Sequence, residues 1–419
     1  MAAKPTKKQL EWQDMELGVI IHLCADIFDP DFHDIKTSGV RERLSPDKMD
    51  SCAPDTDQWL RCASELGAKY AVLVANHCTG FSLWPTKEND YSVASMKWKN
   101  GKGDVVADFI EACKKYNIKP ALYYSTGCNG YYGITDEVKH DYKAAYYREY
   151  SAVVERQLTE LWNNYGELFE IWFDGGVVPF SKGGPDVEGL LRKYQPDAIT
   201  FQGPAGYENN IRWVGNEAGV APEDCFCSFD AADGSPDGRG SITGRYYCPA
   251  ESDFPNRTAK GFGGGWAWRD GEEDTVIPPE KLFECYLNTV GRNTNMLLGM
   301  GISTDGDFKD EEQFIRLGEI IRSEFSDEIP LSIKKDGNTF TVFPESTKPI
   351  KYLVIREKLD DGQHINGFTL SADGRKMAEG SSIGHKRILC LNGLKAENLT
   401  LKITDSYGEY SLRDIKAYS

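Results

Sequence analysis

Polar side chains stand at the ends of several apolar, strand-like runs in this chain. Asp174 ends the run 168–174 and is followed by two glycines, and His22, His77 and Glu217 occupy similar positions after other runs. The carboxyl ends of parallel strands meet on one face of a barrel, and polar residues there are often catalytic. We therefore expect these side chains to converge on one active site.

The residue types restrict the chemistry of that site. The sequence lacks a GxSxG nucleophile motif, a GxxxxGK[ST] phosphate loop, a CxxC pair and an HxxxH pair. What remains is a set of carboxylates among His, Tyr and Trp, namely Asp174, Glu217, Glu251 and Asp253. Glycoside hydrolysis needs two carboxylates, one to attack or to activate water and one to protonate the leaving oxygen. The alternative for each residue taken alone is a structural role, such as an Asp that caps a turn.

The first three quarters of the chain alternate strand-like and helix-like segments. Such alternation predicts a parallel sheet closed into a (β/α)8-like (TIM) barrel over residues 1–329. An open doubly wound sheet is the alternative, which the missing GxGxxG motif disfavours. The expected strands are 18–24, 70–75, 121–125, 168–174, 198–202, 212–214, 246–250 and 296–300. The expected helices are 57–66, 104–116, 141–163, 187–194, 278–289 and 311–323.

The predicted secondary structure changes after Pro330. Short alternating segments such as 339–343, 352–355, 368–370 and 399–403 follow one another without a long helix. This pattern predicts a C-terminal antiparallel β-sandwich over residues 330–419. We expect it to support the barrel, and nothing in its sequence demands that it bind sugar.

Composition excludes several classes of partner. The net charge of −17 disfavours binding to nucleic acid or to an anionic membrane surface. The cysteines, eleven in all, show no zinc spacing, so we expect buried free thiols, no metal site and no cofactor. No run is long and apolar enough for membrane insertion. The start of the sequence does not resemble a secretory signal, so we expect a periplasmic or secreted protein if a signal was removed, and a cytoplasmic one otherwise.

Several motifs in order resemble the α-L-fucosidases of glycoside hydrolase family 29. The family pattern Phe-Gly-Ile-Phe-Ile-His-Trp-Gly corresponds to residues 17–24, and Lys-His-His-Asp-Gly-Phe followed by Leu-Trp corresponds to 76–81 and 83–84. A Trp-Phe-Asp-Gly segment corresponds to 172–175, and a late Asn-rich segment to 293–306. The resemblance covers nearly the whole chain.

The resemblance implies a retaining exo-glycosidase that removes terminal α-L-fucose from oligosaccharides or glycans. Asp174 would be the nucleophile and Glu217 the acid/base, because Glu217 follows a Trp-Val-Gly-Asn segment like that of the α-1,3/1,4-selective branch. Glu251 is the second candidate for the acid/base. The residues implied to bind the sugar are His22, His77, Trp84, Tyr124, Arg212 and Trp266.

Two departures from the family pattern leave alternatives open. The paired His residues are reduced to His77, with Cys78 beside it, and a Gly-rich segment at 263–265 replaces the branch's Ile-Arg-Pro-Gly. The sugar could therefore be a relative of fucose, such as an α-L-galactoside. A catalytically weakened barrel that only binds sugar is the alternative from another class. The sequence predicts neither the aglycone nor the oligomeric state.

Overall fold

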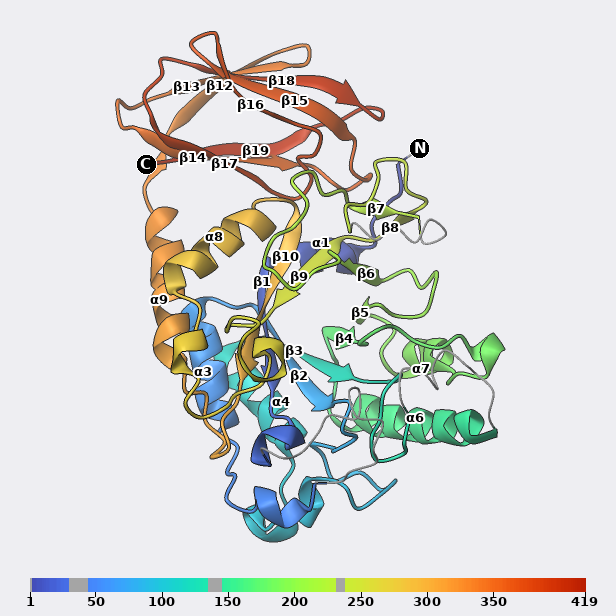
Figure 1. Ribbon diagram of the computed structural model, residues 1–419. Helices are drawn as coiled ribbons and strands as arrows, with labels where there is room; N and C mark the ends of the chain where they lie inside the picture. Colours follow the sequence, from blue (N-terminus) through green and yellow to red (C-terminus); the bar gives the residue numbers. More distant parts are fainter. Residues whose placement is uncertain (1, 30–43, 135–144, 231–237) are drawn as a thin grey trace.

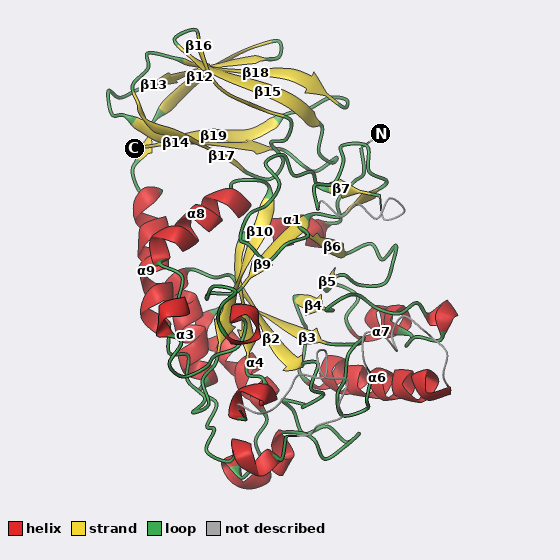
Figure 2. Ribbon diagram, in the orientation of Figure 1, coloured by secondary structure: helices red, strands yellow, loops and turns green. Residues whose placement is uncertain are grey.

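The computed structural model describes residues 2–29, 44–134, 145–230 and 238–419 (Figure 1). It consists of a barrel followed by a two-sheet β domain, which lies against one end of the barrel (Figure 2). The predicted fold class, a (β/α)8-like barrel with an antiparallel β-sandwich, is confirmed.

The barrel closes through parallel pairing in the order β1-β10-β9-β6-β5-β4-β3-β2. Its strands are β1 (Leu17–His22), β2 (Tyr70–Asn76), β3 (Lys119–Tyr124), β4 (Glu170–Trp172), β5 (Ile199–Phe201), β6 (Asn210–Trp213), β9 (Ala250–Phe254) and β10 (Thr294–Gly301). Parallel strands covered on both faces read as continuous apolar runs, and every residue of β1, β2 and β10 is buried.

The seventh strand lies four residues later than the sequence predicted. Residues 246–247 form β8 (Tyr246–Tyr247), which pairs with β7 (Ser228–Phe229) in a hairpin outside the barrel. The barrel strand is β9, which pairs with β6 and β10. The prediction was wrong because Pro249 and the apolar residues before it look like a strand that ends at Ala250. This shift decides the role of Glu251, as described below.

Side chains alternate between the inside and the outside of the barrel. One buried cluster fills the interior and includes Ile20, Val72, Tyr123, Trp172 and Leu297. A larger cluster lies between the strands and the helices. Successive residues of a strand face opposite sides, so alternate positions belong to the same cluster. We call this alternation the parity of a residue along its strand.

Helices cover most of the outer surface of the barrel. They are α3 (Thr56–Leu66), α4 (Val105–Tyr116), α6 (Ala145–Asn164), α7 (Val187–Tyr194), α8 (Pro279–Thr289) and α9 (Glu311–Glu324). Helix α1 (Lys7–Gln13) lies instead at the amino-terminal end of the barrel, where Trp12 joins the interior cluster. The start of the predicted helix 141–163 lies outside the described residues. Between β5 and β6 the described chain turns without a helix, so the outer face of these strands is covered by loops and by the β7–β8 hairpin.

Aspartates fix the start of three of these helices. Asp55, Asp104 and Asp186 each precede a helix and accept a hydrogen bond from a backbone N–H of its first turn, at 2.9–3.0 Å. Such caps satisfy an otherwise unpaired N–H and add about 1 kcal/mol each.

The C-terminal domain is a sandwich of two antiparallel sheets. One sheet has the order β11-β19-β14-β17 and the other β12-β13-β18-β15-β16. The strands are β11 (Glu328–Ile329), β12 (Leu331–Asp336), β13 (Thr339–Pro344), β14 (Ile350–Glu357), β15 (Ile365–Ala372), β16 (Arg375–Gly380), β17 (Arg387–Leu394), β18 (Leu399–Ser406) and β19 (Leu412–Tyr418). Their inward side chains form a separate hydrophobic core.

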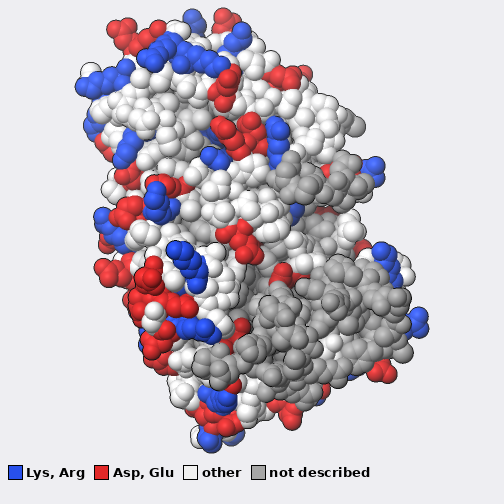
Figure 3. Space-filling view, viewed as in Figure 1, with Lys and Arg blue, Asp and Glu red and all other residues white. Residues whose placement is uncertain are grey.

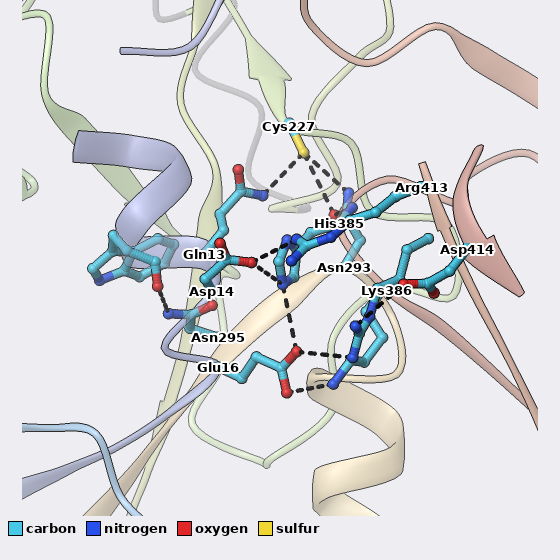
Figure 4. Close-up of polar contacts among 12 residues, drawn as sticks. Gln13, Asp14, Glu16, Cys227, Asn293, Asn295, His385, Lys386, Arg413 and Asp414 are labelled. Carbon is cyan, nitrogen blue, oxygen red and sulfur yellow. Dashed lines mark hydrogen bonds and ion pairs between the residues drawn. The ribbon is translucent and has the colours of Figure 1, made fainter. Parts of the chain in front are cut away.

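A buried ion cluster joins the sandwich to the barrel (Figure 4). Glu16, just before β1, lies between Lys386 and His385 of the sandwich. Burial would raise the pKa of Glu16, but the charges and hydrogen bonds of Lys386 and His385 outweigh it and hold the pKa at about 2. Beside this cluster, Asn293 hydrogen-bonds the carbonyl of Cys225 at 2.8 Å and the backbone of His385. The sandwich is therefore held against the amino-terminal end of the barrel strands.

Charged groups and thiols are distributed as the composition suggested. On the face seen in Figure 3, acidic and basic side chains are interspersed over the sandwich and the helices. All eleven cysteines are free thiols, and only Cys390 is exposed. None of the helices in the described part of the chain is long and apolar enough to cross a lipid bilayer.

Candidate active site

Asp174 lies at the carboxyl end of β4, at the mouth of the barrel. Gly175 and Gly176 follow it with positive φ angles of 65° and 78°, which turn the chain away directly after the strand. The hydroxyl of Tyr123, from the neighbouring strand β3, donates to Asp174 Oδ2 at 3.0 Å. Burial and the charge of Asp174 raise the pKa of Tyr123, so this hydroxyl stays protonated and keeps donating.

Two histidines extend the site from Asp174 across β2 and β1. The His77 ring lies 5.8 Å from Tyr123 and 6.1 Å from His22, measured between centroids. Burial and the charge of His77 lower the pKa of His22 to about 3. His22 is therefore neutral at physiological pH, so its ring has one nitrogen that donates and one that accepts.

Glu217 follows β6, which is two strands along the barrel from β4. The indole N–H of Trp266 donates to Glu217 Oε2 at 3.0 Å, and the Trp266 ring lies 5.1 Å from His22. The segment that carries Trp266 turns through three glycines with positive φ, of which Gly265 is the most constrained. A Cβ on Gly265 would lie 2.5 Å from the carbonyl oxygen of Arg257, so this turn needs glycine.

Asp253 of β9 connects the two carboxylates electrostatically. It is 3% exposed, and its Oδ1 has no hydrogen-bond partner among the described residues. Burial is the main cause that raises its pKa well above the usual range, followed by the charge of Glu251 and then those of Glu217 and Asp174. The charges of Asp174 and Glu217 thus both act on the same buried carboxyl group.

Glu251, the second candidate for the acid/base, does not lie at the mouth. It lies near the amino-terminal ends of the barrel strands, which we call the floor of the barrel. It is fully buried, and it accepts hydrogen bonds from Tyr70 at 2.5 Å and from the indole of Trp172 at 2.9 Å. The corrected strand boundary explains this place, because Glu251 is the second residue of β9 and does not follow a strand. A leaving group at the mouth cannot reach this sealed position.

Glu170 forms a buried carboxyl pair with Glu251. The first residue of β4, it is fully buried and accepts from the Trp12 indole at 3.0 Å. Burial raises the pKa of Glu251 to about 7, and burial together with the charge of Glu251 raises that of Glu170 well above the usual range. Two adjacent carboxyls that cannot both ionise share a proton, and Glu170 donates it to Glu251.

Three predicted sugar-binding residues lie away from the mouth. Tyr124 donates to Gln157 at 2.6 Å, and Trp84 donates to Glu160 at 2.8 Å, so both face helix α6 outside the barrel. Arg212 also faces outward, where it is part of the wall of the cavity described next, and its guanidinium binds the carbonyls of Phe226 and Gly238. On β3, the tyrosine that faces the barrel interior is Tyr123.

A cavity of about 990 Å³ adjoins the mouth. Its wall includes Gly175 and Gly176, which follow Asp174, and Gly215, which precedes Glu217. Aromatic side chains supply much of the rest, among them Tyr207, Trp213, Phe229 and Tyr246. Among the described residues no helix follows β5 or β6, and the cavity lies at this gap in the helix ring, where it adds a largely apolar compartment to the mouth.

Sequence reasoning missed the role of Glu170, although the signal was present. Glu170, Trp172 and Asp174 alternate along one run, so all three face the barrel interior. The same parity argument selects Tyr123, which shares the interior with Ala121, over its neighbour Tyr124. Parity along each strand is thus a better guide to the site than the residue type alone.

The sequence comparisons agree on one family. The profile of the alpha-L-fucosidase family matches residues 31–320. Alpha-L-fucosidase 1 of Arabidopsis thaliana is 28% identical over 457 residues, which cover 95% of this chain and 84% of the plant protein. The profile match includes Asp174, Glu217 and His77, whereas His22 lies before its first residue.

Solved structures resemble the chain over its full length. A candidate alpha-L-fucosidase from Bacteroides thetaiotaomicron is 28% identical, with a TM-score of 0.90 and 100% of both chains covered. A glycoside hydrolase 29 family member from an unknown rumen bacterium is 26% identical, with a TM-score of 0.82 over 100% of this chain and 77% of that one. The similarity therefore includes both the barrel and the sandwich.

Proposed function

This chain belongs to the alpha-L-fucosidase family, glycoside hydrolase family 29, and we propose that it removes terminal α-1,3- or α-1,4-linked L-fucose from branched oligosaccharides or glycans with retention of configuration. One observation carries the proposal. Asp174 and Glu217 follow β4 and β6, which are two strands apart in the barrel, each carboxylate has an oxygen held by a Tyr or Trp donor, and the charges of both act on Asp253.

In this mechanism Asp174 is the nucleophile. It attacks the anomeric carbon of the fucosyl group, and a covalent glycosyl-enzyme forms as the bond to the aglycone oxygen breaks. The Tyr123 hydroxyl fixes the orientation of the attacking carboxylate through its bond to Oδ2.

Glu217 is proposed to transfer the proton. It protonates the aglycone oxygen in the first step and removes a proton from the incoming water in the second. The bond from Trp266 holds Oε2, which leaves Oε1 as the oxygen that exchanges the proton. For retention, we expect the carboxyl groups to stand about 5–5.5 Å apart in the working complex, against roughly 6.5–9.5 Å for inversion.

The rings between the two carboxylates are proposed to bind the sugar. Neutral His22 and His77 offer hydrogen bonds to ring hydroxyls, and the face of Trp266 packs on an apolar side of the sugar. The adjoining cavity supports the linkage preference, because a branched aglycone carries a second sugar next to the scissile bond and needs room beside the mouth.

The stereochemistry of the product tests this proposal. Proton NMR of an aryl α-L-fucoside during hydrolysis should show α-L-fucose first, and initial β-L-fucose would contradict the retaining mechanism. Asp174→Gly should lose turnover, and azide should restore it with β-L-fucosyl azide as product. A set of fucosides that differ only in linkage should give the highest kcat/KM for α-1,3 and α-1,4 links. Saturable fucose binding without turnover would instead indicate a sugar-binding protein.

A further inference from the structure

A thiol lies among the catalytic groups, and the proposed glycosidase reaction gives it no role. The donor atoms of His77, Cys78 and Asp174 all lie within 4.8 Å of one another. Cys78 is 1% exposed, whereas His77 and Asp174 are half-buried and open to the mouth. Imidazole, thiolate and carboxylate are the three ligand types that Zn²⁺ prefers in proteins.

We propose that these three side chains form a binding site for Zn²⁺ or another soft divalent cation, and that the bound ion blocks the nucleophile reversibly. His77 would supply a ring nitrogen, Cys78 its sulfur and Asp174 a carboxylate oxygen. The Cys78 thiol releases its proton to solvent as the sulfur binds the ion. The fourth position of a tetrahedral ion faces the mouth and takes a water molecule.

The distances suit this ion after a small adjustment. Zinc bonds of about 2.0–2.3 Å in a tetrahedron place the donors about 3.3–3.8 Å apart. The donor atoms lie at most 4.8 Å apart, so the widest pair has to approach by about 1 Å. Rotation of the side chains can supply this movement. No strand has to move.

The backbone holds the donors in place before an ion arrives. His77 and Cys78 begin a tight turn in which the amide of Gly80 donates to the carbonyl of His77 at 2.9 Å. The carbonyl of Cys78 accepts from the amide of Gly130 at 2.7 Å. Tyr123 fixes Asp174 from the other side. Donors that are already ordered lose little conformational freedom when the ion binds.

The electrostatic surroundings also favour a cation. Glu217 and Asp174 supply negative charge at the mouth. The site therefore combines ordered donors, access from solvent and an anionic setting.

Binding is tested with Co²⁺, a spectroscopic substitute for Zn²⁺ that reports a thiolate ligand directly. With a non-chelating reductant present, the wild-type protein should show a thiolate-to-cobalt charge-transfer band, and Zn²⁺ should displace it. Cys78→Ser should lose the band and weaken Zn²⁺ binding in calorimetry by at least about 10-fold, the loss caused by removing even an outer-shell partner. Asp174→Asn should also weaken binding while the band of the remaining thiolate persists.

Cys24→Ser is the matched control. Like Cys78, Cys24 is a buried thiol close enough to Tyr123 to raise the pKa of that hydroxyl, but it is not one of the three proposed ligands. This variant should therefore keep the band. A wild-type protein without the band, or a band that survives in Cys78→Ser, would overturn the proposal.

The blocking effect rests on the proposed function, whereas the binding does not. Zn²⁺ should inhibit hydrolysis of an aryl α-L-fucoside competitively, and chelation should restore the rate. In Cys78→Ser, the Zn²⁺ concentration for half inhibition should rise with the calorimetric Kd. If the band depends on Cys78 but the metal-free protein does not hydrolyse fucosides, the metal site stands and the proposed function fails. Inhibition that is unchanged in Cys78→Ser would overturn the blocking role.

Discussion

The mouth and the floor of this barrel contain the same chemical groups in different surroundings. At the mouth, a Tyr hydroxyl and a Trp indole hold Asp174 and Glu217. At the floor, Tyr70 and two Trp indoles hold Glu251 and Glu170. The floor carboxyls are fully buried, with pKa values raised by that burial, whereas Asp174 is half-buried beside a cavity.

The difference shows that access to water, and not the hydrogen-bond partners, separates a reactive carboxylate from a structural one. Helix α1 closes the floor with Trp12, and the sandwich packs against the same end of the barrel. A carboxyl sealed in this way keeps its proton and cannot exchange it with a substrate. The mouth stays open because the strand ends there lead into loops.

The largest expected effect comes from replacing a carboxylate by its amide at each end of the barrel. Asp174→Asn keeps the shape and removes the nucleophile, so kcat on an aryl α-L-fucoside should fall on the order of 10⁴-fold or more, as when other nucleophiles are removed. Glu170→Gln, its counterpart at the floor on the same strand, should retain activity within a few-fold. Comparable losses in the two variants would show that floor and mouth do not differ as described.

The next effect separates the two candidates for the acid/base. Glu217→Ala should lower kcat/KM by roughly 10²–10⁴-fold on glycan substrates and much less on fucosides with activated aryl leaving groups. Glu251→Gln should show no such dependence on the leaving group. If the dependence on leaving-group pKa appears in Glu251→Gln instead, the assignment of Glu217 is wrong.

The floor pair should make stability depend on pH. The pKa of Glu251 rises from 4.5 to about 7 on folding, so the native state keeps a proton that the unfolded state loses. The associated stability is present below pH 4.5 and is lost as the pH rises through about 7. Glu170→Gln should flatten this decline and raise the free energy of unfolding at alkaline pH by about 1–3 kcal/mol.

Urea unfolding at a series of pH values measures this effect. Glu111→Gln, which removes an exposed carboxylate on α4, is the control and should leave the slope of stability against pH unchanged. The free energy of unfolding of the wild-type protein should decline between about pH 5 and pH 8, because the pKa of Glu251 is about 7 in the folded state and 4.5 in the unfolded state. A wild-type protein without this decline would contradict the shared proton.

The smallest effect concerns the indole donor at the mouth. Trp266→Phe keeps an aromatic ring near His22 but removes the N–H that orients Glu217. The loss of one hydrogen bond to a charged group corresponds to about 1.5–3 kcal/mol, or roughly a 10- to 100-fold lower kcat/KM. Trp12→Phe removes the equivalent donor at the floor, and it should affect thermal stability but not kcat/KM.

The misplaced seventh strand shows how a small error in a boundary changes a functional prediction. A strand at 246–250 places Glu251 just beyond its end, at the mouth, whereas β9 (Ala250–Phe254) places it near the beginning, at the floor. Strand boundaries depend on pairing with β6 and β10, which are distant in sequence. Local residue patterns therefore could not locate this end.

The sequence by itself determined the barrel, the sandwich and the place of Asp174. Periodicity and glycine turns depend on neighbouring residues, so they can be recognised in one short segment, as at Asp174-Gly175-Gly176. Tertiary structure alone decided which carboxylates meet water. That outcome depends on strand register and on what covers each end of the barrel, such as Trp12 at the floor and Trp266 at the mouth. Both the strand register and the covering of the barrel ends depend on contacts between segments that are distant in sequence. Local sequence patterns do not contain this information.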